Sequence, residues 1–505
     1  MVEYIKGIPR HQLFLFNECL DELIDENHLV RFIDAYADSL DLEGLGFKIP
    51  EMKTGAQPYS EHLKLKIYIY GYFEKVRSSR RLETECQRNK EMIWLTEGLA
   101  PDFKTIADFR KDNSKAFKNI FKTFLILCNK LELISFNTIA IDGTKFRGQN
   151  SLNEVYQKER MERIEAEIQE RIDRYLKELD DMDQKELEIN LSINQEKIKE
   201  ITGRLSKQMN RLDKIKFIKG IFEADPELKT YYSTDEDCRK QSDKGKVRPG
   251  YNPQTAVDEK NKLIVVADVT NEQNDLKQLS PMLEQVKEIK DELGVIGNTN
   301  GIADAGYFSE KEILKNINQE DINIVISPDA ENKNSRKSEE SDKVPAAGFE
   351  QKDFCYDKGK DVFTCPVGHE LKKINQTVRV DRHNREVNDY RCDSQICNTC
   401  PQKALCTNSE NGRMLKVSAN MELMMAYLEG LKTEENKLLI RKRKEIVEHP
   451  FGTIKRTFGY TYFLLKGLDK VKSEFSFICF IYNLKRVLNI IPINRLVAEI
   501  NGSIA

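Results

Sequence analysis

The first part of the chain carries a mostly helical pattern of apolar positions. Residues 1–130 are predicted to form an N-terminal helical domain. Between Leu63 and Ile69 the aliphatic residues alternate as in a strand, with tyrosines on the other face. The length of this stretch without Gly or Pro breaks nevertheless favours a helix. Thr105 is the expected N-cap of the short helix that follows.

An insertion at residues 149–245 has a different pattern. Its first half repeats apolar residues at helical spacing, and a second series from Leu191 to Ile215 follows a heptad after a polar break. We therefore expect a helical hairpin or a coiled coil, which packs or dimerises. The residues of the first series are Ile164, Ile168, Ile172, Leu176 and Leu179.

Short apolar runs on either side of this insertion predict strands. They occupy residues 137–142, 251–258, 262–270, 300–309 and 322–328. The second and third runs form an expected hairpin, and helices are expected between the later ones. This order predicts an α/β fold with a mixed sheet, antiparallel first and with parallel crossovers after. The core segments are 131–148, 246–328 and, in C-terminal helices, 421–505.

Composition narrows the class of protein. A chain of 505 residues predicts two to four domains, and 39% hydrophobic with 32% charged residues suits a globular protein. The sequence has no run of eighteen apolar residues, so a transmembrane span is not expected. The first twenty residues lack the signal-peptide pattern. We expect a cytoplasmic protein.

Two aspartates end predicted strands. Asp142 precedes Gly143, and Asp304 ends the stretch GIAD. Ligands gather at the carboxyl ends of neighbouring strands in such sheets. Together with a helical Glu, these carboxylates would form an oxygen site for one or two Mg²⁺ ions, which activate water and stabilise a leaving 3′ oxygen in phosphoryl transfer.

Glu448 is the candidate for the third carboxylate. It lies in the basic stretch RKRKEIVEHPFGTIKR, residues 441–456, and Glu445 is the alternative ligand. From residue 432 to 495 there are 14 Lys or Arg against 6 Asp or Glu, although the net charge of the chain is −3. A local basic surface is therefore expected. Alternatively, Glu448 forms a salt bridge on a solvated helix.

Basic residues from two segments are candidates for DNA contacts. The basic residues near Glu448 would hold a DNA strand beside that carboxylate. The arginines of the turn KVRSSRR would contact DNA phosphates; the alternative is that this turn is only solvated. Under this hypothesis residues 1–130 bind DNA. The candidates are Arg77, Arg80, Arg81, Arg441, Lys444 and Lys455.

Cysteines cluster in a second insertion, residues 329–420, whose first part is highly charged and predicts a mobile loop. Five of the 11 cysteines lie within residues 365–406. In a reducing compartment they predict metal rather than disulfides. We expect a structural Zn²⁺, because thiolates suit Zn²⁺ as carboxylates suit Mg²⁺; reduced loop cysteines are the alternative. The expected ligands are Cys365, Cys397, Cys400 and Cys406, with Cys392 or His369 as substitutes.

Longer stretches resemble one protein family. They are IAIDGTKFR, STDEDCRK, YNPQTAVD, IADAGYFS and EIVEHPFGTIKRTFGYTYFLLKGLDKVKSEF, with DELIDENHLVRFIDAYADSLDLEGLGF and FEKVRSSRRLETECQRN near the start. Over almost its whole length the chain is similar to bacterial insertion-sequence transposases of the DDE type. Within the IS-four-like superfamily it most resembles the branch called IS-eleven-eighty-two.

This resemblance implies an RNase H-like core and a metal-binding triad on Asp142, Asp304 and Glu448, with Mg²⁺ or Mn²⁺, two ions per site. In the Tyr-Arg-Glu-Lys signature of the superfamily, Lys455 matches the Lys. Lys444 stands where Arg is usual, and Arg441 stands where Tyr is usual. Pro450 is expected to bend the helix near Glu448 or to start a new one.

The implied activity is DNA transposition. The enzyme would bind terminal inverted repeats as a homodimer, cut a phosphodiester with a metal-positioned water and transfer the 3′-OH to target DNA. Three alternatives remain: a DNA-binding protein that has lost the chemistry, a metal-dependent nuclease without strand transfer, and a scaffold organised by the coiled coil.

Overall fold

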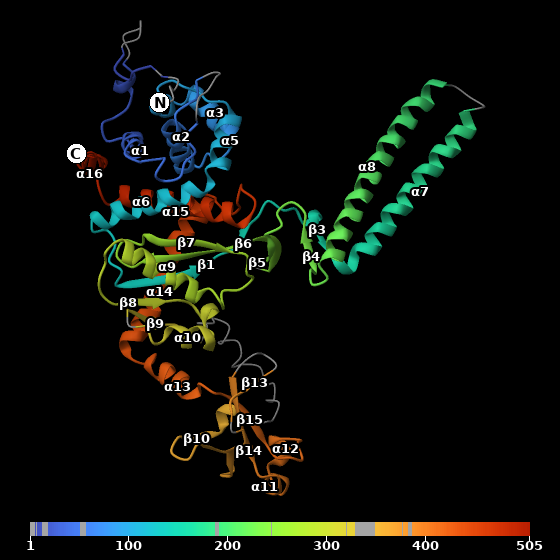
Figure 1. Ribbon diagram of the computed structural model, residues 1–505, viewed down its shortest axis with the longest axis vertical. Coiled ribbons are helices and arrows are strands. Elements are labelled where there is room, and N and C mark those ends of the chain that lie inside the picture. Colours follow the sequence, from blue (N-terminus) through green and yellow to red (C-terminus); the bar gives the residue numbers. More distant parts are fainter. Residues whose placement is uncertain are drawn as a thin grey trace, which may run out of the picture. The chain divides into compact units, whose positions relative to one another are not determined.

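The computed structural model (Figure 1) describes residues 6, 8–12, 19–50, 57–186, 191–243, 245–319, 321–328, 349–375, 377–381 and 386–504. The chain divides into two compact units. The first unit comprises Met1–Gly301 with Lys444–Ala505, and the second comprises Ile302–Arg443. Most of the charged stretch expected to be a mobile loop, residues 329–348, lies outside the described residues.

The N-terminal part of the first unit is helical, as expected. Its helices are α1 (Leu29–Asp38), α2 (Glu61–Phe73), α3 (Ser79–Arg88), α4 (Lys90–Leu95), α5 (Phe103–Asp112) and α6 (Ser114–Lys130), after a short 3-10 turn η1 (Leu20–Leu23). Ser60 caps α2, because its hydroxyl accepts from the N–H of Leu63 at 3.1 Å. The N-cap of α5 is Asp102, which accepts from the N–H groups of Lys104 and Thr105. The prediction of Thr105 as N-cap was wrong.

Two helices of the first unit are buried on nearly all sides. In α2 both the aliphatic residues and the tyrosines are inaccessible, which explains the strand-like alternation in the sequence. The second is α15 (Leu468–Leu488), which packs on α6. Aromatic side chains join these helices: the rings of Phe117 and Phe477 meet edge to face at 4.8 Å, as do those of Phe124 and Phe480 at 5.1 Å.

A sheet forms the centre of the first unit, so the expected mixed α/β architecture is confirmed. Its strand order is β2-β6-β1-β8, and β5 and β7 also pair with β6. The pairs of β6 with β1 and with β7 are antiparallel, as expected. The strands are β1 (Thr138–Gly143), β2 (Phe146–Arg147), β5 (Arg239–Asp243), β6 (Lys246–Asp258), β7 (Ile264–Thr270) and β8 (Thr299–Ile302).

Helices cover both faces of this sheet (Figure 1). α6 and α15 lie on one side, and α9 (Leu279–Glu292) lies on the other. The side chain of Asn483 on α15 bonds both backbone groups of Ile264, at 2.8 Å each. Buried Asp258 closes the turn before β1 by accepting from the N–H groups of Ser135 and Phe136. The ends of the core strands are thereby fixed.

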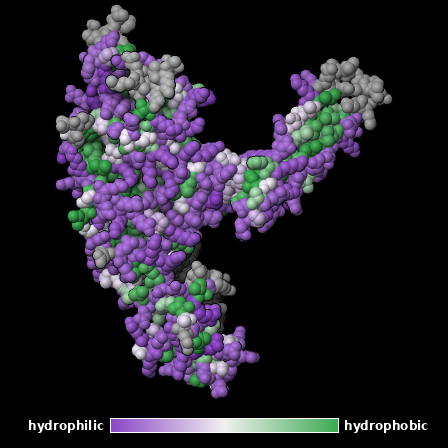
Figure 2. Space-filling model, viewed as in Figure 1, coloured by the Kyte–Doolittle hydropathy of each residue, from purple (hydrophilic) through white to green (hydrophobic). Residues whose placement is uncertain are grey.

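The first insertion is a helical hairpin with a small base. α7 (Met161–Glu186) and α8 (Leu191–Ala224) pack on each other through a cluster that includes Ile168, Leu212 and Ile215. At the base, β3 (Val155–Gln157) pairs with β4 (Thr230–Tyr232), beside the 3-10 turns η2 (Leu152–Glu154) and η3 (Lys158–Arg160). Figure 2 shows apolar surface along this hairpin, where Leu176, Met209 and Phe217 are exposed. Coiled-coil geometry and dimerisation stay predictions.

The second unit contains a small antiparallel sheet that the sequence did not predict. Its order is β10-β11-β12-β14-β13, and β15 pairs with β14. Its elements are η6 (Gln351–Asp353), β10 (Cys355–Asp357), β11 (Val362–Thr364), β12 (Glu370–Lys373), β13 (Arg379–Val380), β14 (Glu386–Cys392), α11 (Ser394–Asn398), α12 (Lys403–Cys406) and β15 (Met414–Ser418). The other elements of this unit are η4 (Ala305–Tyr307), α10 (Glu310–Asn316), β9 (Ile322–Val325) and α13 (Met421–Gly430).

The last long segments include the helix that carries Glu448. α14 (Glu434–Gly452) continues through Pro450 and is followed by a π-helical turn η7 (Thr453–Thr457), so the helix does not end at the proline. α16 (Ile493–Ile504) closes the described chain. Within the described part no single helix is long and apolar enough to span a membrane. The segments Leu468–Leu488 and Ile493–Gly502 reach the required length and apolar composition only when taken together, and they are bent by 114° relative to each other.

Candidate active site

Asp142 stands at the end of the most buried part of the sheet. Ile139, Ala140 and Ile141 before it are fully inaccessible, whereas Asp142 is partly exposed. It pairs with Thr255 of β6, whose hydroxyl donates to the Asp142 carbonyl at 3.4 Å. Its Oδ1 accepts from the N–H of Gly143 at 3.0 Å. A carboxylate is therefore held at the point where a rigid strand reaches the surface.

A polar network adjoins this strand end. Asp275, in the loop between β7 and α9, accepts with Oδ1 from Asn252 Nδ2 at 2.7 Å and from Gln254 Nε2 at 2.8 Å. Gly143 is required beside it, since a Cβ there would lie 2.4 Å from Gln254 Nε2 and 2.9 Å from Asp275 Oδ1. Sequence reasoning missed Asp275, because it follows the polar stretch NEQN and no motif marks it.

Glu448 lies on the exposed side of α14. Ile446 and Val447 before it are each 1% exposed and fix the rotation of the helix, so Glu448 faces outward, as does the alternative Glu445. His449 anchors this turn through Nδ1, 2.9 Å from the Tyr482 hydroxyl, and that hydroxyl donates to the Lys262 carbonyl at 2.8 Å. Burial lowers the pKa of His449, with Arg486 and Lys262 acting in the same direction.

Asp304 follows β8 and belongs to the second unit. Its Oδ1 accepts from the N–H of Gly306 at 2.9 Å and caps the short turn η4. Asp142 and Glu448 belong to the first unit. Among the described residues no three His, Cys, Asp or Glu side chains form a group that could hold a metal ion. A shared metal site on Asp142, Asp304 and Glu448 stays a prediction.

The predicted DNA-contacting residues have different surroundings. Arg441, Lys444, Arg80 and Arg81 are exposed, and the Arg80 guanidinium lies 4.5 Å from the centre of the Phe103 ring. Lys455 on η7 is partly buried, with its Nζ 5.5 Å from the Phe146 ring centre.

Arg77 is buried instead. Its guanidinium donates to the Tyr462 carbonyl at 3.1 Å, lies 3.6 Å from Glu474 Oε1 and stacks 4.2 Å from the Tyr460 ring centre. Burial raises the pKa of Glu474, while the charges of Arg110 and Arg77 and the N–H groups of Leu464 and Leu465 oppose this rise. These contacts give Arg77 a structural role, and its predicted contact with DNA stays untested.

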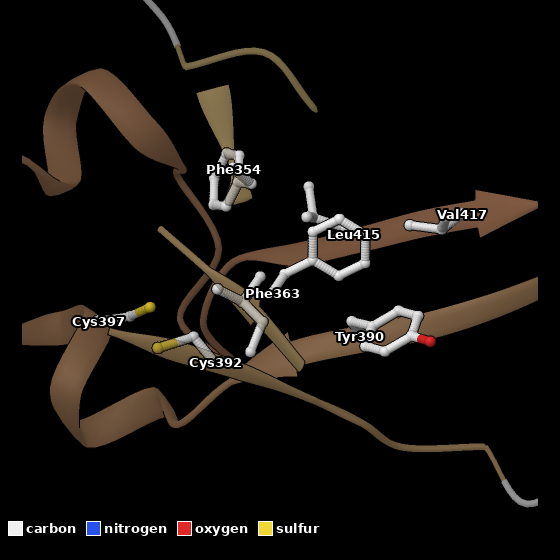
Figure 3. Close-up of a cluster of buried hydrophobic side chains, with 8 residues drawn as sticks. Phe354, Phe363, Tyr390, Cys392, Cys397, Leu415 and Val417 are labelled. Atoms are coloured by element: carbon white, nitrogen blue, oxygen red, sulfur yellow. The ribbon is translucent and has the colours of Figure 1, made fainter. Parts of the chain in front are cut away.

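The five clustered cysteines line one small cavity in the second unit. The cavity has a volume of about 20 Å³, and its walls include Cys365, His369, Cys392, Cys397, Cys400 and Cys406. All eleven cysteines of the chain are free thiols. Figure 3 shows the sulfur atoms of Cys392 and Cys397 near each other at one end of the apolar cluster. The structure thus gathers both the expected ligands and their two substitutes.

Backbone N–H groups point at two of these sulfur atoms. The N–H of His369 donates to Cys365 Sγ at 3.2 Å, and that of Arg413 donates to Cys397 Sγ at 3.4 Å. Burial raises the pKa of Cys392, and its hydrogen bond to Cys397 adds to this effect. No three of these side chains form a group that could hold a metal ion, so zinc stays a prediction.

Comparisons with known proteins indicate the class of protein to which the chain is similar. A family model described as a transposase DDE domain matches residues 364–488, and a second transposase domain model, DUF772, matches residues 18–112. No curated protein matches the chain. A solved structure, described as the piggyBac transposase synaptic complex with hairpin DNA, matches at 11% identity and a TM-score of 0.29 over 95% of this chain and 78% of that chain. This TM-score is too low to support an argument about the fold.

The two family matches support a transposase of the insertion-sequence kind, and the DDE domain implies a DNA transposase enzyme. Enzymes of the DDE family generally use divalent metal ions. The assignment to the IS-four-like superfamily and to its IS-eleven-eighty-two branch stays a prediction.

Proposed function

We propose that the protein is a DDE transposase of the IS-four-like superfamily and the IS-eleven-eighty-two type. It binds the terminal inverted repeats of its insertion sequence, hydrolyses phosphodiester bonds there and transfers the freed 3′-OH ends to target DNA. The observation that carries this proposal is the DDE-domain match over residues 364–488, which include Glu448. The position of Asp142 at the partly exposed end of β1 supports it.

The proposed core is RNase H-like. Three antiparallel strands in the order β7-β6-β1, with β8 beside β1, support this assignment. Asp142, Asp304 and Glu448 would hold Mg²⁺ or Mn²⁺, two ions per site, because carboxylate oxygens are the donors that these hard cations prefer. When bound, the ions supply an activated water and neutralise charge on the leaving oxygen.

Protein side chains would bind and orient the DNA. Lys444 and Lys455, with Arg441, Arg80 and Arg81, would bind phosphates and orient the DNA strand toward the carboxylates. Arg77 would act by holding the segment around Tyr462 in place, as its buried contacts indicate. No covalent protein nucleophile is required, because positioning and electrostatics account for phosphoryl transfer of this kind.

The cysteine cluster would bind a structural Zn²⁺. Cys365, Cys397, Cys400 and Cys406 are the proposed ligands, with Cys392 or His369 as substitutes. The shared cavity and the two N–H···S hydrogen bonds support this proposal, since backbone donors stabilise thiolate sulfur. The metal would fix the small sheet and take no part in catalysis.

We further propose a cytoplasmic homodimer that pairs two element ends. The exposed apolar residues of the α7–α8 hairpin offer a surface for subunit contact. Sedimentation of the purified chain with and without end DNA tests this: a dimer that the triple change L176S, M209S and F217S converts to a monomer is expected, and an unchanged dimer would rule out the hairpin contact.

The test of function is a cleavage and joining assay. Duplexes carrying the inverted repeats that flank the reading frame are incubated with plasmid and Mg²⁺. Nicked ends and joined products are expected. Hydrolysis without joining would identify a nuclease instead, and binding without either product would identify an inactive DNA-binding protein. Full activity of the Asp142→Asn variant would favour a scaffold role.

A further inference from the structure

A groove on the first unit is lined by cations from separate segments. Two adjoining cavities of about 570 and 290 Å³ share the wall formed by Arg147, Arg248 and Pro249. We call their combined walls the basic groove. The charged residues that line it are Lys145, Arg147, Asp243, Lys246, Arg248 and Lys455. The groove is therefore lined by five cationic side chains and one acidic side chain. The first of the cations in sequence, Lys145, comes three residues after Asp142.

The backbone that presents these cations is firmly held. β2 pairs with β6 on one side, and on the other Arg147 N–H donates to the Thr461 carbonyl at 3.0 Å while its carbonyl accepts from Phe463 N–H at 2.9 Å. Gly250 makes the first pairing possible, because a Cβ there would lie 2.1 Å from the Phe146 carbonyl oxygen. Arg147 is therefore fixed at its backbone while its side chain is exposed.

An aromatic side chain orients Arg147 further. Tyr462 is 37% exposed and lines the larger cavity. Its ring centre lies 5.6 Å from the Arg147 guanidinium carbon and 4.7 Å from that of Arg77. Arg77 in turn holds the Tyr462 carbonyl. The buried network of Arg77 and Glu474 thus supports the wall of the groove.

Two buried polar atoms in the smaller cavity lack hydrogen-bond partners in the part of the chain that the structure describes. Lys145 Nζ and Gln241 Oε1 are buried, and neither has a hydrogen-bond partner among the residues that the structure describes. Asp275 Oδ1 lies 3.9 Å from Lys145 Nζ but is already engaged by Asn252 and Gln254. Burial lowers the pKa of Lys145; Asp275 and Asp243 oppose this effect, and the charge of Lys455 adds to it. The Lys145 ammonium is a donor that an anionic ligand in this cavity would satisfy, whereas Gln241 Oε1 is an acceptor and is no evidence for an anion.

We propose that the basic groove binds the phosphodiester backbone of a DNA strand that leads to Asp142. Arg147 and Arg248 bind phosphates with their planar donor forks, and Lys145 and Lys455 contact the phosphates nearer the carboxylate. A line of cations suits a polyanion better than a small acid, which would need a closed pocket with few charges. This inference rests on the proposed function and names the subsite for its substrate.

The test measures binding apart from chemistry. The probes are a fluorescein-labelled single strand and a duplex, both of arbitrary sequence, because phosphate contacts carry no sequence information. Anisotropy is recorded in EDTA, so that nothing is cut, over a series of salt concentrations. The variant R147Q/R248Q is compared with R163Q/R174Q, which removes the same charge from exposed positions on α7. Thermal unfolding confirms that both variants fold.

Loss of the two groove arginines should weaken binding about a hundredfold, since a charge-assisted hydrogen bond contributes about tenfold or more. The slope of log affinity against log salt should fall by about two on the duplex. R147K/R248K should restore the slope and part of the affinity. Equal affinity and slope for R147Q/R248Q and R163Q/R174Q would overturn the proposal, as would failure of the wild type to bind either probe.

The same proteins separate this inference from the proposed function. Wild-type protein that binds through the groove but neither cuts nor joins end DNA with Mg²⁺ would refute the transposase activity and leave the groove standing. R147Q/R248Q protein that binds normally while the wild type cuts and joins would refute the groove alone.

Discussion

The strand end at Asp142 and the cysteine cluster of the second unit gather reactive side chains in opposite surroundings. Asp142 is partly exposed, and three residues after it in sequence Lys145 lines the smaller of the two cavities of the basic groove, which measure about 570 and 290 Å³. The cysteines line a cavity of about 20 Å³ against the apolar cluster of Phe363, Tyr390 and Leu415. An open, hydrated surface such as the one at Asp142 can admit a substrate, as an active site requires. A structural metal site is closed, as the cavity of the cysteines is.

The largest expected effect concerns the closed site. If the cysteine cluster holds the proposed Zn²⁺, the change C397S should abolish its binding and unfold the small sheet, because structural zinc contributes about 10 kcal/mol or more to folding in zinc-finger peptides. C355S is the matched control, since Cys355 is exposed and does not line the cavity. Elemental analysis and limited proteolysis check the result; a protein without zinc, equally resistant in both variants, would contradict it.

At the open site, Asp142→Asn should reduce DNA cleavage about 10³-fold or more while leaving the fold intact, because such catalysis depends chiefly on electrostatic stabilisation of the transition state. D291N, an exposed acid on α9, is the control. Initial rates of nicking in Mg²⁺ measure the effect. A rate within tenfold of wild type would remove Asp142 from the catalytic residues.

The next largest expected effect concerns the buried pair of Arg77 and Glu474, which supports the wall of the basic groove. Arg77→Met leaves Glu474 short of a partner, and breaking a buried pair costs about 3 kcal/mol. R80M removes an exposed arginine of the first turn of α3, three residues further along the chain, and should cost less than about 0.5 kcal/mol. Urea unfolding compares the two variants. Equal stability would show that the pair of Arg77 and Glu474 contributes little.

The smallest expected effect is a gain in stability. Burial lowers the pKa of Lys145, so the folded state binds fewer protons than the unfolded state between the folded pKa and 10.5. Stability therefore rises with pH through that window. K145M should be more stable than wild type at neutral pH by about 1 kcal/mol, and the advantage should shrink as pH approaches 10. Thermal unfolding at several pH values tests this; a variant less stable at neutral pH would refute it.

The sequence predicted the parts of the fold whose patterns are local. β1, the β6–β7 hairpin, α9 and the helical hairpin of the insertion all follow from apolar periodicity. The small sheet of the second unit was missed, because its strands are short and are held by pairing with β14 rather than by their own pattern. Of the two alternatives at Pro450, the start of a new helix is wrong, because α14 runs through the proline and a π-helical turn follows; a bend at Pro450 stays a prediction.

The residues of the two candidate sites also differ in how far the sequence marks them. Asp142 was identifiable because it ends an apolar run, and the cysteines because they are close in sequence. The basic groove was not, since Lys145, Arg248 and Lys455 come from three distant segments and only the pairing of β2 with β6 and with residues 461–463 brings them together. The burial of Arg77 could not be predicted from the sequence, because no local pattern signals its buried partner Glu474.

The most direct test of the central claim replaces Mg²⁺ with Fe²⁺ and adds ascorbate and peroxide, which cut the polypeptide next to a bound iron. If Asp142, Asp304 and Glu448 hold one metal centre, fragments should end near all three residues, and excess Mg²⁺ should suppress them. Cuts near only one of the three, or cuts that Mg²⁺ does not suppress, would contradict the account.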